Sequence, residues 1–192
     1  MDIKELESSY KKLYSAIESE HHQVFERQDL DGVARLMKAV EAADQVFLMG
    51  VGREGIAARS FAMRLMHLGK ASHWIWDDTT PGMHEGDLFI CVNGSGDISH
   101  INCVLENAVR TGASTFAITG SRKGRAAAIA GDCLFVPATV YKGTDDVVPS
   151  IQPMGNLFEQ HLFMLFDIIV MLLEKEMKVD NAEMSRRHRN IE

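Results

Sequence analysis

The sequence has few cysteines and no long basic run, and both shortages exclude classes of function. Its three cysteines, Cys91, Cys103 and Cys133, have neither the even count nor the close spacing of a disulfide framework or a zinc site. No cluster of five or more basic residues occurs, and the formal net charge is -7. Because binding to a phosphate backbone needs a positive stripe, we expect reduced thiols and no nucleic-acid partner.

Signals for secretion and for membrane insertion are also lacking. The first residues, MDIKELESSYKK, are polar and amphipathic, without the basic segment and apolar core of a secretory signal. The longest apolar stretch, residues 162–173, is interrupted by Asp167 and is shorter than the roughly 20 residues that cross a bilayer. We therefore expect a cytoplasmic protein that has no membrane partner.

Length and periodicity predict one α/β domain. A chain of 192 residues, 46% hydrophobic and 24% charged, can form one substantial core, whereas two domains would both be small. Apolar spacing predicts N-terminal helices within residues 1–43, with Asp29 as an N-cap, an α/β core over 44–153, and a long apolar helix with a tail over 154–192. The expected strands cover residues 45–51, 71–77, 87–92, 114–119 and 132–138.

Alternation of these strands with helices predicts a three-layer α/β/α sandwich around a five-stranded parallel sheet. In such sheets, ligands bind beyond the carboxyl ends of the strands, where the strand order reverses. With the order 2-1-3-4-5, the reversal lies between the first and third strands. Both of these strands run into glycine-rich turns, so we expect the two turns to face each other across one crevice.

The two turns suggest two different anions. Residues 50–55 (GVGREG) match the dinucleotide pattern G-x-G-x-x-G, and Asp77 or Asp78 stands where a ribose-binding acid is expected. Residues 93–97 (NGSGD) instead suit a monophosphate, held by backbone N–H groups, the Ser95 hydroxyl and the following helix dipole. A dinucleotide leaves this second turn unexplained, although a nucleotide-dependent oxidoreductase stays open as a rival.

An ordered set of motifs resembles the 6-phospho-3-hexuloisomerases of the sugar isomerase (SIS) domain superfamily. The motifs are GVGR (50–53), FAMRLMHLG (61–69), TTP (79–81), GDL (86–88), GSG (94–96), QPMG (152–155), LFE (157–159) and RHRN (187–190). The resemblance implies a SIS fold and a homo-oligomer, either a dimer or a tetramer. It also implies that a sugar phosphate is isomerised without a metal or an organic cofactor, by moving a proton between C2 and C3 through a cis-enediol.

The resemblance assigns the catalytic roles to Glu159 and His188. Glu159 is the candidate base, and otherwise it is a first-turn glutamate that favours the helix dipole. His188 is the candidate acid or proton shuttle, on a tail that reaches a neighbouring subunit's crevice or is disordered. His84 is a reserve acid, while His67 and His161 stand on largely apolar helices and are expected to be core or interface residues.

The candidate binding residues come from three loops at the strand ends. They are Gly52, Arg53, Thr79, Thr80, Asn93, Gly94, Ser95, Gly96, Asp97 and Ser99. Several positions depart from the family pattern: Glu54 and Asn93 each replace a serine, Asp97 replaces a glutamate, and Ile98 replaces a threonine. Ser99 is expected to supply a lost hydroxyl, and residues 76–78 (WDD) also differ from the family motif before Thr79. These departures motivate a second hypothesis, a non-catalytic SIS module that binds a phosphosugar as a sensor.

Overall fold

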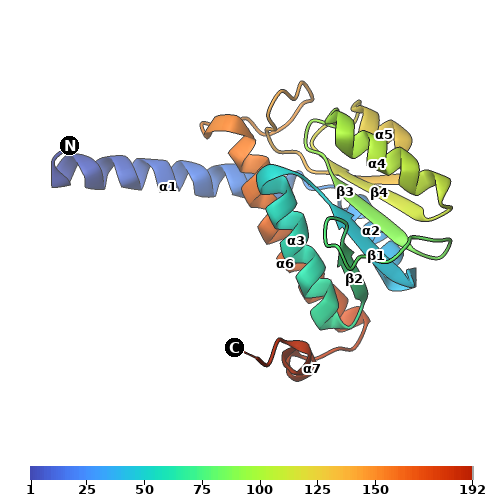
Figure 1. Ribbon diagram of the computed structural model, residues 1–192. Helices are drawn as coiled ribbons and strands as arrows, with labels where there is room; N and C mark the ends of the chain where they lie inside the picture. Colours follow the sequence, from blue (N-terminus) through green and yellow to red (C-terminus); the bar gives the residue numbers. More distant parts are fainter. Residues whose placement is uncertain (192) are drawn as a thin grey trace.

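Five parallel strands form the central sheet of the computed structural model, which describes residues 1–191 (Figure 1). They are β1 (Gln45–Met49), β2 (Ala71–Trp74), β3 (Leu88–Val92), β4 (Ser114–Thr119) and β5 (Asp132–Phe135). The strand order is β2-β1-β3-β4-β5, which confirms the predicted order. Every residue of the central strand β3 is buried, as expected for a parallel sheet that is covered on both faces.

Three strands end earlier than the sequence predicts. β1 stops at Met49, before the glycine-rich turn. β2 stops at Trp74 because the N–H of Asp77 donates to the Trp74 carbonyl at 2.9 Å and closes a turn. β5 stops at Phe135, and the N–H of Ala138 bonds locally to the Val136 carbonyl at 2.8 Å. Local turn bonds thus begin at the ends of β2 and β5.

Helices cover both faces of the sheet, as the three-layer prediction requires (Figure 1). The helices α2 (Leu30–Ala42), α3 (Gly52–Leu68) and α6 (Asn156–Glu176) lie on one face, and α4 (Ser99–Arg110) and α5 (Arg125–Ile129) lie on the other. Side chains of β1 alternate between the two cores, with Leu48 facing α3 and α6 and Phe47 facing α4. This alternation follows from the two-residue period of a strand.

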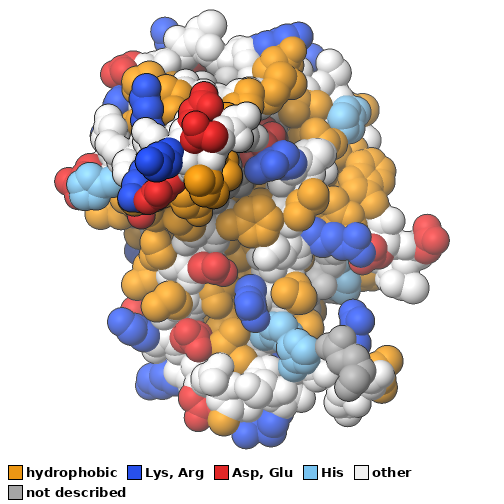
Figure 2. Space-filling view, turned by 90° about the vertical axis from the view of Figure 1, so that its left-hand side faces the viewer, with side chains coloured by type: hydrophobic (Ala, Val, Ile, Leu, Met, Phe, Trp, Pro, Cys, Tyr) orange, Lys and Arg blue, Asp and Glu red, His pale blue; other side chains and the backbone are white. Residues whose placement is uncertain are grey.

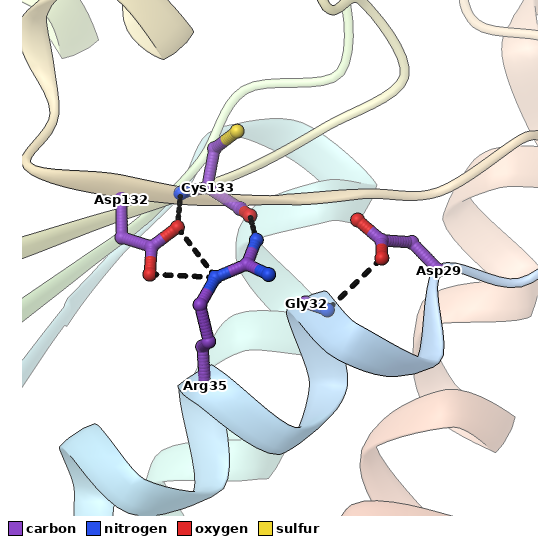
Figure 3. A network of polar contacts seen from close by, with 5 residues as sticks. All are labelled: Asp29, Gly32, Arg35, Asp132 and Cys133. Atoms are coloured by element: carbon purple, nitrogen blue, oxygen red, sulfur yellow. Dashed lines mark hydrogen bonds and ion pairs between the residues drawn. The ribbon is translucent and has the colours of Figure 1, made fainter.

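Helix α2 is held to the edge strand β5 by a polar network (Figure 3). Asp29 caps α2 as predicted, since its Oδ1 accepts from the N–H of Gly32 at 2.9 Å. Arg35 donates through Nε to both carboxylate oxygens of Asp132, at 3.0 and 2.8 Å, and through Nη2 to the carbonyl of Cys133 at 3.2 Å. These contacts set the position of α2 along the sheet edge.

The first helix, α1 (Ile3–Glu26), projects from the body of the molecule, and only its C-terminal part packs against α6 (Figure 1). The predicted apolar stripe is therefore exposed in the single chain. Ile3, Leu6, Tyr10 and Leu13 are between 50% and 75% exposed. Figure 2 looks onto this end of the molecule, where apolar side chains lie exposed among charged ones.

Helix α6 is a largely apolar helix on the sheet face that α3 also covers. The helical stretch Pro153–Glu176 is long and apolar enough, by length and composition, to cross a membrane, whereas the apolar run 162–173 within it is shorter. Half of its most apolar window is buried inside the chain, where it packs against α3 and α1. Such packing is that of a core helix. Its outer face leaves Phe163, Ile168 and Met171 exposed.

A turn with positive φ values precedes α6, and a short helix follows it. A 3₁₀ turn, Pro153–Gly155, precedes the helix, and both Met154 (φ 59°) and Gly155 (φ 80°) adopt positive φ, so α6 begins at Asn156 rather than at the predicted Met154. Beyond α6, the tail forms a short helix, α7 (Asn181–Arg187), with a capping box at its start. The tail is therefore ordered against α3 and is not the disordered segment that the sequence left open.

Candidate active site

A cavity of about 720 Å³ opens at the carboxyl ends of β1 and β3, between the two glycine-rich turns. Its position is the one that the reversal of strand order predicts. The lining comes from the turn after β1, the turn after β3, the loop after β5 and the start of α6. The lining residues are Val51, Gly52, Arg53, Glu54, Ser95, Asp97, Ile98, Tyr141, Lys142, Met154, Asn156 and Glu159.

An ion pair joins the two helices that enclose this cavity. Arg53 Nε lies 2.7 Å from Glu159 Oε2, with side-chain exposures of 57% and 17%. Arg53 stands in the first turn of α3, where a cation opposes the helix dipole, and the Glu159 carboxylate offsets that cost. Glu159 Oε2 is buried, and its contact with Arg53 lacks hydrogen-bond geometry, so the ion pair is the interaction that holds this oxygen at the cavity wall.

Glu54 lies beside this pair and contacts the second turn. Its Oε2 accepts a hydrogen bond from the N–H of Gly94 at 3.1 Å, and a Cβ added at Gly94 would collide with Glu54 Oε1. Burial raises the pKa of Glu54 to about 7, the Glu159 charge acts in the same direction, and the Gly94 N–H opposes both. The glutamate that replaces the family serine is thus inside the site and close to the predicted phosphate turn.

Asn93 shapes the second turn from beneath. It is fully buried, and its Nδ2 donates to Asn102 Oδ1 at 3.0 Å while its Oδ1 accepts from the N–H of Ile98 at 3.4 Å. Asn102 in turn donates to the Gly96 carbonyl at 3.0 Å. Because the amide of Asn93 is used within the turn, the structure places it behind the cavity wall and not on it.

The rest of this turn faces the cavity in part. Ser95 and Asp97 belong to the lining, and Asp97 Oδ1 accepts from the N–H of Arg125 at 3.1 Å. Ser99, the first residue of α4, is exposed and outside the lining. Ile98 is the N-cap residue of α4, and its side chain makes no capping hydrogen bond. The first backbone N–H groups of α4 therefore have no capping side chain as an acceptor.

Thr79 and Thr80 lie away from the cavity within one chain. Thr80 Oγ1 donates to the Trp74 carbonyl at 2.8 Å and caps the end of β2. It also borders a separate apolar cavity of about 230 Å³ on the α4 side of the sheet, whose lining includes Phe47 and Phe89. Thr79 is exposed. The structure therefore does not bring these two threonines to Glu159.

His188 is placed at the opposite end of α3. Its ring stacks on His67 with the centroids 5.3 Å apart, and both line a second cavity of about 320 Å³. Arg187 Nη1 donates to the His67 carbonyl at 3.0 Å and holds the tail there. Since α3 extends over 17 residues, or roughly 25 Å, a single chain does not bring His188 to Glu159. His84 is exposed in the loop before β3 and also lies outside the lining.

The sequence missed a wall formed by the loop after β5. Tyr141 and Lys142 line the cavity, and Lys142 brings a cation to it on a backbone with φ of 64°. The region has no apolar periodicity, so nothing in its pattern indicates which side chains face inward. Asn156, at the start of α6, also belongs to the lining and could have been found only by its closeness in sequence to Glu159.

The sequence also missed Glu20 on α1. This buried carboxylate accepts hydrogen bonds from Ser150 Oγ at 2.7 Å, the Ile151 N–H at 2.8 Å and Gln152 Nε2 at 2.9 Å. Burial acts to raise the pKa of Glu20, but these three bonds together outweigh it and lower the pKa below its usual value. Glu20 thus anchors the segment that leads into Met154 and the cavity.

Beside Glu20, a histidine pair joins α1 to α6. His161 Nδ1 lies 3.3 Å from His21 Nδ1, and the ring centroids are 5.6 Å apart. His161 is fully buried, and burial, aided by the charge of His21, lowers its pKa to about 4. This pairing fits the expectation that His161 is a core histidine. Within residues 1–191, no group of three or more His, Cys, Asp or Glu side chains is arranged to hold a metal ion.

Comparison with known proteins identifies relatives over most of the chain. No protein-family model matches. A Bacillus subtilis protein named 3-hexulose-6-phosphate isomerase is 32% identical over 158 residues, which cover 82% of this chain and 85% of the relative. A protein of the same name from Mycobacterium gastri is 34% identical over 164 residues, covering 85% and 82%.

A solved structure agrees with these relatives. It is a Methanococcus jannaschii protein for which a 3-hexulose-6-phosphate isomerase function has been inferred, and it matches with a TM-score of 0.82 at 26% identity. The match covers 94% of this chain and 99% of that one. On these identities and coverages, the chain belongs to the 3-hexulose-6-phosphate isomerase family of sugar isomerase (SIS) domain proteins.

Proposed function

We propose that this protein is a cytoplasmic phosphosugar isomerase that interconverts ketose phosphates. The substrate and product that we propose are 3-hexulose 6-phosphate and fructose 6-phosphate. The observation that carries the proposal is the Arg53–Glu159 pair, which lines a cavity bounded by the glycine-rich turn after β3. A carboxylate in the cavity lining supplies a base, and the guanidinium paired with it supplies donors for a developing oxyanion. The names of the relatives support the same reaction.

In this proposal, Glu159 removes the proton from the carbon next to the carbonyl group. The electron pair of that C–H bond forms the C2–C3 double bond of a cis-enediol, and the carbonyl oxygen takes a proton from an acid, for which His188 is the candidate. Glu159 then gives the first proton to the former carbonyl carbon, while the hydroxyl group on the other carbon returns its proton to the acid and becomes the new carbonyl. Arg53 orients the carboxylate and stabilises the negative oxygen. The step needs no cofactor, because each proton that is removed is also returned.

The phosphate is assigned to the turn after β3 and the start of α4. Gly94, Ser95, Gly96 and Asp97 form this turn, and no side chain caps the first N–H groups of α4, which a phosphate can therefore take. Lys142 lines the same cavity and adds positive charge. This arrangement leaves the carbon chain of the sugar to extend toward Glu159.

We also propose that the active form is a dimer or tetramer and that His188 serves the site of a neighbouring subunit. Ile3, Leu6, Tyr10 and Leu13 follow the alternating three- and four-residue spacing of a coiled coil and are exposed on the projecting half of α1. A second copy of α1 is the occupant that this pattern suits. Because His188 lies far from Glu159 within one chain, only an assembly can bring the two residues together.

Exchange with deuterated water tests the isomerase directly. We expect the protein to incorporate deuterium at C3 of fructose 6-phosphate, and Glu159→Gln to reduce the rate at least 100-fold. The matched control is Glu41→Gln, an exposed glutamate on α2 at the opposite end of the sheet, which should exchange like the wild type. Absence of exchange and of product across hexulose, pentulose and amino-sugar phosphates would overturn the enzyme proposal.

The shared site has its own test. A mixture of Glu159→Gln and His188→Gln chains, each inactive alone, should regain part of the activity after subunit exchange, because a hybrid assembly holds sites with both wild-type residues. Leu6→Asp combined with Tyr10→Asp should reduce the molar mass measured by light scattering. Mixed chains that stay inactive, although subunit exchange is demonstrated, would contradict the role of His188.

A phosphosugar sensor is the second candidate, and the altered turns favour it specifically. Glu54 and Ile98 remove two hydroxyl groups from the predicted phosphate site and add a carboxyl group. If calorimetry shows tight binding of a sugar phosphate that stays unchanged, and Glu159→Gln binds it equally well, the sensor replaces the isomerase.

A further inference from the structure

Glu54 is a feature of the cavity that the proposed isomerase chemistry does not use. It stands in the first turn of α3, half-buried, with Oε2 3.1 Å from the N–H of Gly94. Gly94 is the first residue of the turn that is assigned to the phosphate. Glu54 therefore holds one N–H donor of that turn and faces the space where the phosphate is expected.

The charges around Glu54 do not neutralise it. Glu159 approaches from α6, and Arg53, which lies beside them, has its Nε on Glu159. Asp97 from the turn after β3 and Lys142 from the loop after β5 line the same cavity at its rim. Two like charges 4 Å apart repel by about 4 kcal/mol at an effective dielectric of 20, so an ionised Glu54 would oppose a phosphate dianion.

A protonated Glu54 removes this conflict. Its carbonyl oxygen can keep the bond from the Gly94 N–H, while its O–H becomes a donor. The family serine at this position offers one hydroxyl donor, and a neutral carboxyl group offers the same function at the end of a longer side chain. Burial and the Glu159 charge favour the neutral form and raise the pKa of Glu54 to about 7, against the opposing effect of the Gly94 N–H.

We propose that Glu54 takes part in phosphate binding at this site by donating, as a neutral carboxylic acid, a hydrogen bond to a phosphate oxygen of the sugar phosphate, so that binding is coupled to uptake of one proton. This inference rests on the proposed function only in that a phosphosugar is the ligand. The coupling has a direction: a site that must take up a proton binds the dianion more weakly as the pH rises above 7.

Calorimetry at pH 8 measures the coupling. The probe is glucitol 6-phosphate, which has no carbonyl group and cannot be isomerised, and its phosphate is already a dianion at this pH. Titrations in two buffers with different enthalpies of ionisation give the number of protons taken up. From a pKa of about 7 we expect uptake of roughly 0.9 proton per site in the wild type, and an affinity that falls up to about tenfold per pH unit above 7.

Two variants at one position and one control make the test decisive. Glu54→Ser restores the family hydroxyl and Glu54→Gln keeps the size of the side chain, and both should bind at pH 8 with proton uptake near zero and little dependence on pH. Glu41→Gln removes one exposed carboxylate at the far end of the sheet and should behave like the wild type.

The outcomes separate this inference from the proposed function. If the wild type binds glucitol 6-phosphate without proton uptake, the role of Glu54 is refuted while the phosphosugar site stands. Proton uptake that persists in Glu54→Ser also refutes it, because another group or the phosphate then takes the proton. If neither the wild type nor the variants bind any sugar phosphate, the proposed function itself fails.

Discussion

The substitution Glu20→Gln tests the contact between α1 and the segment that leads into α6. Glutamine keeps the size of the side chain but replaces one carboxylate oxygen by an N–H₂ group, which faces donors from Ser150, Ile151 and Gln152. A hydrogen bond to a charged acceptor contributes about 1.5–3 kcal/mol, and the amide of the new glutamine can accept only some of the three hydrogen bonds that the carboxylate accepts. We therefore expect a loss of about 2–4 kcal/mol, which lowers Tm by roughly 5–15 °C for a chain of this size.

Glu20→Gln should also reduce catalysis, and its effect on stability should depend on pH. The anchored segment leads into Met154 and Gly155, whose positive φ values set the start of α6 and thus the position of Glu159, so we expect kcat to fall as well. The pKa of Glu20 is lowered from 4.5 in the folded state, and the stability that it contributes is present above pH 4.5 and lost as the pH falls through the folded pKa. The difference between wild type and variant should accordingly shrink in acid.

Thermal unfolding and steady-state rates check both effects. Glu18→Gln is the matched control, since Glu18 is an exposed glutamate on the same helix and should leave Tm and kcat unchanged. A Tm of Glu20→Gln within 1 °C of the wild type at neutral pH, a margin of roughly 0.3–0.5 kcal/mol for this chain length, would refute the reasoning.

Three further predictions test the core, the histidine pair and the second turn. Phe166→Ala should cost about 3–5 kcal/mol in urea unfolding, because Phe166 stacks on Phe61 at 4.5 Å between α3 and α6. His161 should make the protein lose up to about 3 kcal/mol as the pH falls from 6.5 to 4, since the unfolded histidine binds a proton that the buried one does not, and His161→Phe should flatten this slope in unfolding curves. Gly94→Ala should weaken sugar-phosphate binding in calorimetry, because the added Cβ collides with Glu54 Oε1 and also crowds the side chains of Phe158 and Val140, so that the turn itself must shift.

The strand order and the place of the cavity could be predicted because they follow from local patterns. Residues 45–49 and 88–92 are apolar runs that end in glycine-rich turns, and a parallel sheet brings such ends to one edge. The motif with Glu159 lies at the start of the last helix, so its presence at the same edge follows from the topology. The loop with Lys142 has no such pattern and could not be placed.

Periodicity and turn chemistry act over a few neighbouring residues, so the sequence by itself determined the sheet and its two glycine-rich turns, while the choice of Glu159 came from the resemblance of its motif to the hexuloisomerases. Only the tertiary structure decided that Arg53 pairs with Glu159, that Glu54 bonds to Gly94, and that His188 lies at the far end of α3. The residues that these contacts join are between 40 and more than 100 positions apart in the chain. The contacts depend on how α3 packs against α6 and the sheet. Packing of distant elements, not local pattern, determines the charge and hydrogen bonding inside the site.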